Sequence, residues 1–120
     1  MKVGVLVQFT SKTDIEAKFT ELKELGVDSC QLVCWDRPTL HDDVMVEKIN
    51  KAIEKFGIRV TAFWCGWEGR RVWDFYEGQL TLGLVPTDYR VERMKMILEG
   101  SDFAKKIHVT DLATHVGYMP

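Results

Sequence analysis

The chain has 120 residues, enough for one domain with a hydrophobic core, and its hydrophobic and charged fractions of 46% and 28% are typical of globular proteins. The net charge of −2 offers no basic field for phosphate backbones or anionic lipids, and no apolar run approaches the ~20 residues of a membrane span. We therefore expect neither a nucleic acid nor a membrane as a partner.

The opening residues and the cysteines bear on the cellular compartment. The start, MKVGVLVQF, is short and lacks a small-residue cleavage site, so we interpret it as a buried strand and not as a signal peptide. The three cysteines, Cys30, Cys34 and Cys65, are odd in number and have no CxxC spacing. This pattern predicts free thiols in a reducing compartment, the cytoplasm, with packing as their role.

The first strand–helix unit covers residues 2–26. Residues 2–9 form a continuous apolar run rich in β-branched side chains, which is typical of a strand covered on both faces. A helix is predicted next, with Thr13 and Glu16 as a capping box and Gly26 as its terminating residue. Residues 29–35 give the second predicted strand.

The second unit repeats this order. Thr39 and Asp42 are candidate caps of a helix that Gly57 ends, and residues 59–65 form the third predicted strand. We expect the buried stripe of this helix to consist of Val44, Ile49, Ile53 and Phe56.

A long loop over about 66–86 precedes the third predicted helix and the fourth strand, residues 109–115. Gly100 lies inside this helix, where glycine costs ~1 kcal/mol relative to alanine, so we expect the helix to bend or break there. Its expected core side chains are Met94, Ile97, Phe103 and Ala104.

The alternation predicts an α/β fold with a parallel four-stranded sheet, three helices and strand order 1-2-3-4, in a single domain over residues 1–120. Two architectures fit: a small open sheet with helices on both faces, or half of a (β/α)₈ barrel with all helices outside. No glycine-rich phosphate loop follows the first strand, which disfavours a nucleotide-binding open sheet.

Polar and aromatic side chains gather at the predicted carboxyl ends of the strands. Gln8, Trp35, Trp64 and His115 follow the four strands in turn, and Trp67 begins the long loop. Aromatic walls beside glycines at the mouths of parallel strands are typical of a small-ligand pocket. The alternative interpretation makes the tryptophans a plug over the core and His115 a hydrogen-bonded loop residue.

The same loop carries charges in the segment WEGRR. Glu68, Arg70 and Arg71 either hold an anionic substrate or belong to a solvated loop, and the residues alone leave both interpretations open.

The segments KVGVLVQF, ELKELGVDSCQLVCW, KFGIRVTAFWCGWEG and VTDLATHVGYMP together resemble the N-terminal part of the xylose isomerase-like TIM barrels, of the sugar phosphate isomerase/epimerase type. The most specific piece is THVGYMP, because related barrels carry a histidine-x-glycine motif just after the fourth strand. The resemblance covers essentially the whole chain and implies an N-terminal half-barrel, with four of the eight strands.

In that family a divalent metal (Mn, Mg or Zn) and a pair of carboxylates move a proton next to a carbonyl group. These groups come from later strands, so the resemblance assigns no catalytic residue and no metal ligand to this sequence. We expect no cofactor and little activity for this chain alone. His115 matches a pocket-facing position that contacts substrate in sugar isomerases and binds zinc in endonuclease relatives, and Trp35 and Trp64 match positions that line the sugar pocket.

A half-barrel would leave its first and fourth strands as open edges. Unpaired edges template pairing with another chain, so we expect a homodimer through these edges. The alternative function is therefore a non-catalytic half-barrel module that self-assembles and binds a small sugar-like ligand.

Overall fold

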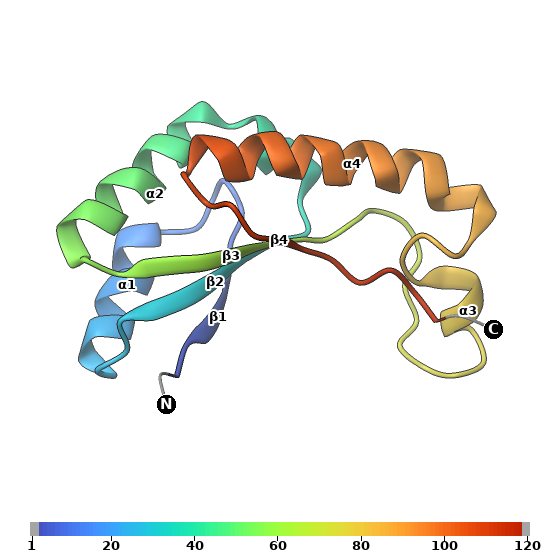
Figure 1. Ribbon diagram of the computed structural model, residues 1–120, viewed down its shortest axis with the longest axis horizontal. Helices are drawn as coiled ribbons and strands as arrows, with labels where there is room; N and C mark the ends of the chain where they lie inside the picture. Colours follow the sequence, from blue (N-terminus) through green and yellow to red (C-terminus); the bar gives the residue numbers. More distant parts are fainter. Residues whose placement is uncertain (1–2, 119–120) are drawn as a thin grey trace.

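The computed structural model describes residues 3–118, in which strands and helices alternate (Figure 1). The strands are β1 (Val5–Gln8), β2 (Ser29–Cys34), β3 (Arg59–Cys65) and β4 (Leu112–Ala113). The helices are α1 (Ile15–Glu24), α2 (Asp43–Phe56), α3 (Gly78–Thr81) and α4 (Thr87–Lys106), with a 3₁₀ helix, η1 (Arg37–His41). In this described part of the chain, no helix has the length and apolar character needed to cross a membrane.

The four strands form one parallel sheet in the order β1-β2-β3-β4, which confirms the predicted order. Helices α1, α2 and α4 wrap around one side of this sheet, as in a barrel, rather than covering both faces (Figure 1). The molecule is therefore an α/β protein with half of a TIM barrel, and the open-sheet alternative is excluded.

The core lies between the sheet and these three helices. Val7, Leu32 and Phe63 are register neighbours on β1, β2 and β3, and each is at most 6% exposed. Register neighbours on parallel strands point to the same face, and this face packs against Phe103 of α4, whose ring centroid lies 5.2 Å from that of Phe63. On the opposite face, Leu6 is 68% exposed.

The helix ends agree with the sequence in part. Gly57 ends α2 in the left-handed conformation, and Asp42 caps its start by accepting from the N–H groups of Val44 and Met45. The predicted capping box of α1 is wrong: the cap is Asp14, which accepts from Ala17. The hydroxyl of Thr13 is used elsewhere, because it accepts from the N–H of Thr10 in the preceding turn.

The predicted core faces of α2 and α4 are partly wrong. Val44 and Met94 are largely exposed, whereas Met45, Arg93 and Met96 are buried. The docking of each helix on the sheet selects the buried face, and the apolar pattern alone fits more than one rotation.

Helix α4 runs without a break through Gly100, so the expectation that it breaks there is wrong. A Cβ atom on Gly100 would lie 2.4 Å from Sγ of Cys65, because α4 packs directly against β3 at this point. The glycine therefore serves close helix–sheet packing. Cys65 itself is fully buried, as expected of a packing residue.

Two strand boundaries and one helix also differ from the prediction. The start of the first predicted strand, Lys2, lies outside the described residues, and β1 begins at Val5. Strand β4 is shorter than predicted, because beyond Ala113 the hydroxyl of Thr114, not a backbone N–H, donates to the Cys65 carbonyl. The long loop contains the short helix α3, which was not predicted.

Candidate functional site

The inner face of the sheet carries the candidate site. The strand register places Gln8, Val33, Trp64 and Ala113 in one row across β1 to β4, on the side opposite the helices. A hollow of about 530 Å³ opens over this face. Its lining residues are Leu6, Gln8, Gln31, Val33, Trp35 and Trp64. The structure thus brings together three of the five predicted site residues: Gln8, Trp35 and Trp64.

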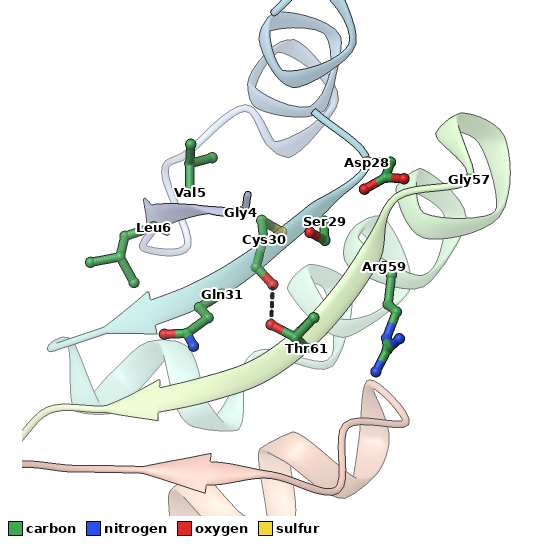
Figure 2. A pocket seen from close by; sticks show the side chains of 10 residues that line it. All are labelled: Gly4, Val5, Leu6, Asp28, Ser29, Cys30, Gln31, Gly57, Arg59 and Thr61. Atoms are coloured by element: carbon green, nitrogen blue, oxygen red, sulfur yellow. Dashed lines mark hydrogen bonds between the residues drawn. The ribbon is translucent and has the colours of Figure 1, made fainter. Parts of the chain in front are cut away.

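A second hollow of about 660 Å³ lies at the amino ends of the same strands (Figure 2). Leu6 and Gln31 line both hollows, so the two are neighbours along the inner face. The larger hollow is the less suitable site, because parallel barrels place their chemistry at the carboxyl ends of the strands. Moreover, one of its polar groups is already used: the hydroxyl of Thr61 donates to the Cys30 carbonyl.

An unbroken series of aromatic rings leads from the hollow into the long loop. Trp64 and Trp35 meet edge to face with centroids 4.7 Å apart, and Trp35 meets Trp67 at 5.2 Å. The ring of Trp67 stacks on that of Trp73 with centroids 6.3 Å apart, and the centroid of Trp73 lies 5.0 Å from that of the His115 ring. Edge-to-face and offset arrangements are the favoured geometries of such rings. The series therefore connects the wall of the hollow to His115 through continuous ring contacts.

The predicted residues therefore have different positions in the site. Trp67 is fully buried, so it supports the wall of the hollow from behind. His115 does not line the hollow and is separated from the lining residue Trp35 by the rings of Trp67 and Trp73. The indole N–H of Trp67 donates to the His115 carbonyl at 3.2 Å, which ties the two together.

The histidine-x-glycine motif orients the imidazole. The N–H of Gly117 donates to Nδ1 of His115 at 3.0 Å. Gly117 has φ +107°, and a Cβ atom there would lie 2.4 Å from the Leu82 carbonyl oxygen, so the turn requires glycine. An Nδ1 that accepts a hydrogen bond carries no proton, and the proton of neutral imidazole is then on Nε2. His115 is thus arranged as a hydrogen-bond donor.

This arrangement does not suit metal binding. A neutral imidazole that binds metal through Nε2 carries its proton on Nδ1, where it would oppose the Gly117 N–H. In the described residues 3–118, no group of three histidine, cysteine or acidic side chains is placed to hold a metal ion. The three free cysteines are all buried, and burial raises the pKa of Cys30 and Cys34 to about 11 and of Cys65 to about 12. These residues therefore do not fit a metal ion.

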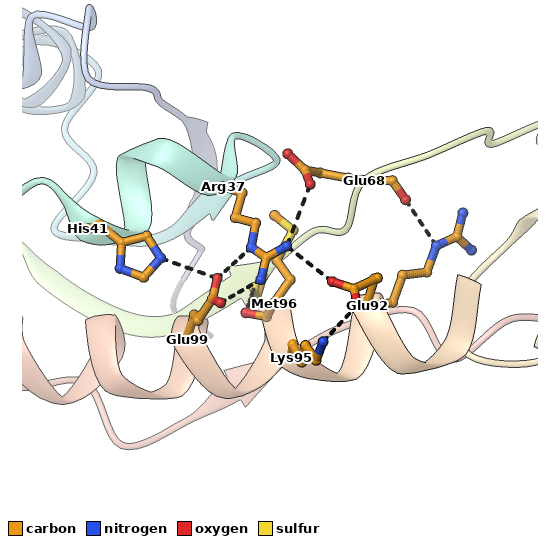
Figure 3. A network of polar contacts seen from close by, with 9 residues as sticks. Arg37, His41, Glu68, Glu92, Lys95, Met96 and Glu99 are labelled. Carbon is orange, nitrogen blue, oxygen red and sulfur yellow. Dashed lines mark hydrogen bonds and ion pairs between the residues drawn. The ribbon is translucent and has the colours of Figure 1, made fainter. Parts of the chain in front are cut away.

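A network of polar contacts surrounds Arg37 between η1 and helix α4 (Figure 3). The guanidinium of Arg37 binds both carboxylate oxygens of Glu99 at 2.6 and 2.7 Å, and lies 3.5 Å from Glu92 and 4.0 Å from Glu68. His41 Nε2 lies 3.3 Å from Glu99. The hydrogen bonds from Arg37 lower the pKa of Glu99. The network joins η1, which follows Trp35, to helix α4 and to the start of the long loop.

Arg93 of helix α4 binds the backbone of the long loop. Its side chain is 1% exposed, and among residues 3–118 it donates only to backbone carbonyls. The acceptors are those of Glu68, Arg70, Thr81 and Gly83, at 2.7 to 3.0 Å. Its Cζ also lies 4.2 Å from the ring centroid of Trp67 and 4.4 Å from that of Tyr89. The sequence does not predict this role, because an arginine in an amphipathic helix is typical of the solvated face.

Gln31 was also missed as a lining residue. Its signal was present in the sequence: a glutamine inside an otherwise apolar strand, two residues before Val33 and four before Trp35, shares their face.

Comparisons with known proteins bear on the fold. No protein-family model and no curated protein matches the chain. Among solved structures, the chain is similar to the crystal structure of a xylose isomerase domain protein from Planctomyces limnophilus, with a TM-score of 0.82 and 24% sequence identity. The match covers 98% of this chain and 42% of that protein, so the chain spans less than half of the relative's length. The chain therefore has the fold of half a TIM barrel of the kind found in a xylose isomerase domain protein.

Proposed function

We propose that this chain forms the sugar-binding part of a metal-dependent sugar or sugar phosphate isomerase/epimerase-like protein and is not catalytic by itself. The observation that supports this proposal most is the pairing of Trp35 and Trp64 with Gln8 and Gln31 around one hollow at the inner face. Aromatic faces bind the apolar face of a sugar ring, and amide groups both donate to and accept from hydroxyls.

His115 would act beside this pocket, at the end of the ring series. With Nδ1 occupied by Gly117, its Nε2–H is the group that can donate to a hydroxyl or carbonyl oxygen of the ligand. Because the described residues do not fit a metal ion, the metal ligands of such a reaction would come from outside this chain. The resemblance assigns the acid–base carboxylates to later strands, so they would come from there as well. The free, buried thiols support a cytoplasmic location.

The test is to measure sugar binding to the purified chain through its tryptophan fluorescence, with an aldopentose and an aldohexose as probes. We expect Trp64→Ala and Gln8→Ala each to weaken binding by about tenfold, since a lost packing or hydrogen-bonding contact costs ~1–2 kcal/mol. Tyr76→Ala is the matched control, because this side chain is 91% exposed and lies outside the hollow. Equal affinity in all four proteins would contradict the proposal.

The bare inner face favours a second candidate function, a self-assembling half-barrel module. Four parallel strands from each of two copies make the eight of a closed barrel, with β1 of one copy beside β4 of the other. Closure would bury Leu6, which is 68% exposed, and enclose the hollow. An interface of about 1,600 Å² suffices for a stable dimer. Sedimentation at micromolar concentration tests this candidate. A monomer that still binds the sugar would exclude it.

A further inference from the structure

Arg71 lies against the wall of the inner hollow. Its Cζ is 4.5 Å from the ring centroid of Trp35, and Trp35 lines the hollow. Its Nη1 donates to the Trp67 carbonyl at 3.3 Å. The stacking contact and this hydrogen bond fix the plane of the guanidinium, and no other group in the described part of the chain accepts from its remaining N–H donors.

The positive charge of Arg71 has no acidic partner within residues 3–118, and the nearby acidic groups are engaged elsewhere. Glu77 is paired with Arg70, and Glu68 lies 4.0 Å from Arg37. An exposed arginine that stacks on a ring without an ion pair differs from the other arginines of this loop region, whose charges are paired or satisfied by carbonyl groups.

A second unpaired cation lies behind it. Arg93 donates to backbone carbonyls and packs between two aromatic rings, and no carboxylate neutralises it in the described chain. Desolvation lowers the pKa of Arg93, and the charge of Arg71 lowers it further. The two guanidinium groups, over the adjoining rings of Trp35 and Trp67, therefore make a local positive field beside one wall residue of the hollow, which an anion would relieve.

We propose that Arg71, held on the face of Trp35, binds an oxyanion of the ligand whose uncharged part occupies the hollow. This inference rests on the proposed sugar-binding function and specifies its substrate class as an anionic sugar, either a phosphate ester or a sugar acid. The planar fork of a guanidinium matches both groups, because two parallel N–H donors can bind two oxygens of a phosphate or a carboxylate.

The experiment compares three ligands that differ in charge: an aldopentose, its 5-phosphate and its aldonic acid, with inorganic phosphate as a fourth probe. Isothermal titration gives the affinities, and tryptophan fluorescence reports on Trp35. Charge-assisted hydrogen bonds strengthen binding, so we expect an anionic sugar to bind at least ~10-fold more tightly than the neutral one, with the preference falling as salt is raised. The preferred anion identifies the ligand as a phosphate ester or a sugar acid.

Arg71→Gln should abolish the preference for the anion and leave the affinity for the neutral sugar unchanged. Arg71→Lys should keep part of it, because the charge remains and the fork is lost. Arg70→Gln is the matched control: it removes an adjacent arginine whose charge is paired with Glu77, and the preference should persist.

The outcomes separate the two proposals. Neutral sugar binding with no anion preference, or a preference that survives Arg71→Gln, would overturn the anion site and leave the sugar pocket intact. Binding of phosphate that depends on Arg71, without binding of any neutral sugar, would support the anion site and overturn the sugar pocket. Binding of none of the four probes would overturn both.

Discussion

The N–H of Gly117 donates to Nδ1 of His115 at 3.0 Å and so leaves Nε2 as the nitrogen that carries the proton of the neutral imidazole. The same glycine passes under the Leu82 carbonyl oxygen, at a distance that excludes a side chain. The spacing of the histidine-x-glycine motif is thus a consequence of one hydrogen bond and one close approach.

The first prediction concerns this turn. Nitrogen chemical shifts in the imidazole of His115 should show a proton on Nε2 at neutral pH, and Gly117→Ala should remove that preference and destabilise the fold. Gly26→Ala is the control, because Gly26 also has a positive φ but nothing lies within 4 Å of an added Cβ. The control should cost about 1–2 kcal/mol of unfolding free energy from backbone strain alone, and Gly117→Ala clearly more. A proton on Nδ1 in the wild-type protein would contradict the assignment.

The second prediction concerns the contact between α4 and β3. Gly100→Ala gains about 1 kcal/mol of helix propensity, but its methyl group would overlap with Cys65 Sγ, and overpacking of a core costs about 1–3 kcal/mol. We therefore expect net destabilisation in urea unfolding. Adding Cys65→Ala removes the overlapping sulfur, so the double variant should be more stable than the sum of the single effects implies. Simple additivity would show that the two residues do not compete for space.

The third prediction follows from the buried thiols. Burial raises the pKa of Cys65 from its ordinary value of 9.0 to about 12. A raised pKa means that the folded state holds the proton more tightly, so this stabilisation is complete below pH 9.0 and is lost as pH rises toward 12. The free energy of unfolding should fall over this window, and less steeply in Cys65→Ala. Rapid reaction of the native thiols with a disulfide reagent at pH 8 would contradict this, since a buried thiol is inert.

The fourth prediction tests self-association through the inner face. Leu6→Lys places a charge on the bare face and should reduce the sedimenting mass to that of a monomer. Val91→Lys is a matched control, because Val91 is 63% exposed on helix α4, whereas Leu6 is 68% exposed on β1. The control should retain the wild-type mass. Loss of association in both variants would point to a general effect of charge and not to the inner face.

Several features of the fold could be read from local pattern. The helix-ending glycine Gly57 and the Asp42 cap depend on neighbours in sequence, and both appear as predicted. The four apolar strands also appear, although β1 and β4 are shorter than expected. The strand order and the position of the tryptophans at the strand ends follow from the simple winding of successive strand–helix units. The chemistry of the pocket wall, with Trp35, Trp64 and Gln8, was therefore visible in the sequence.

What the sequence by itself determined was thus the alternation of elements and the residues at the strand ends, because both rest on short-range periodicity and backbone preference. The tertiary structure decided which face each helix buries and made Arg93 a core residue. It also explains the glycine at position 100, where helix α4 packs directly against β3. It also decided that Trp67 lies behind the wall and that Arg71 stacks on Trp35. These outcomes depend on side chains distant in sequence competing for the same space and for the same hydrogen-bond acceptors, which no local pattern records.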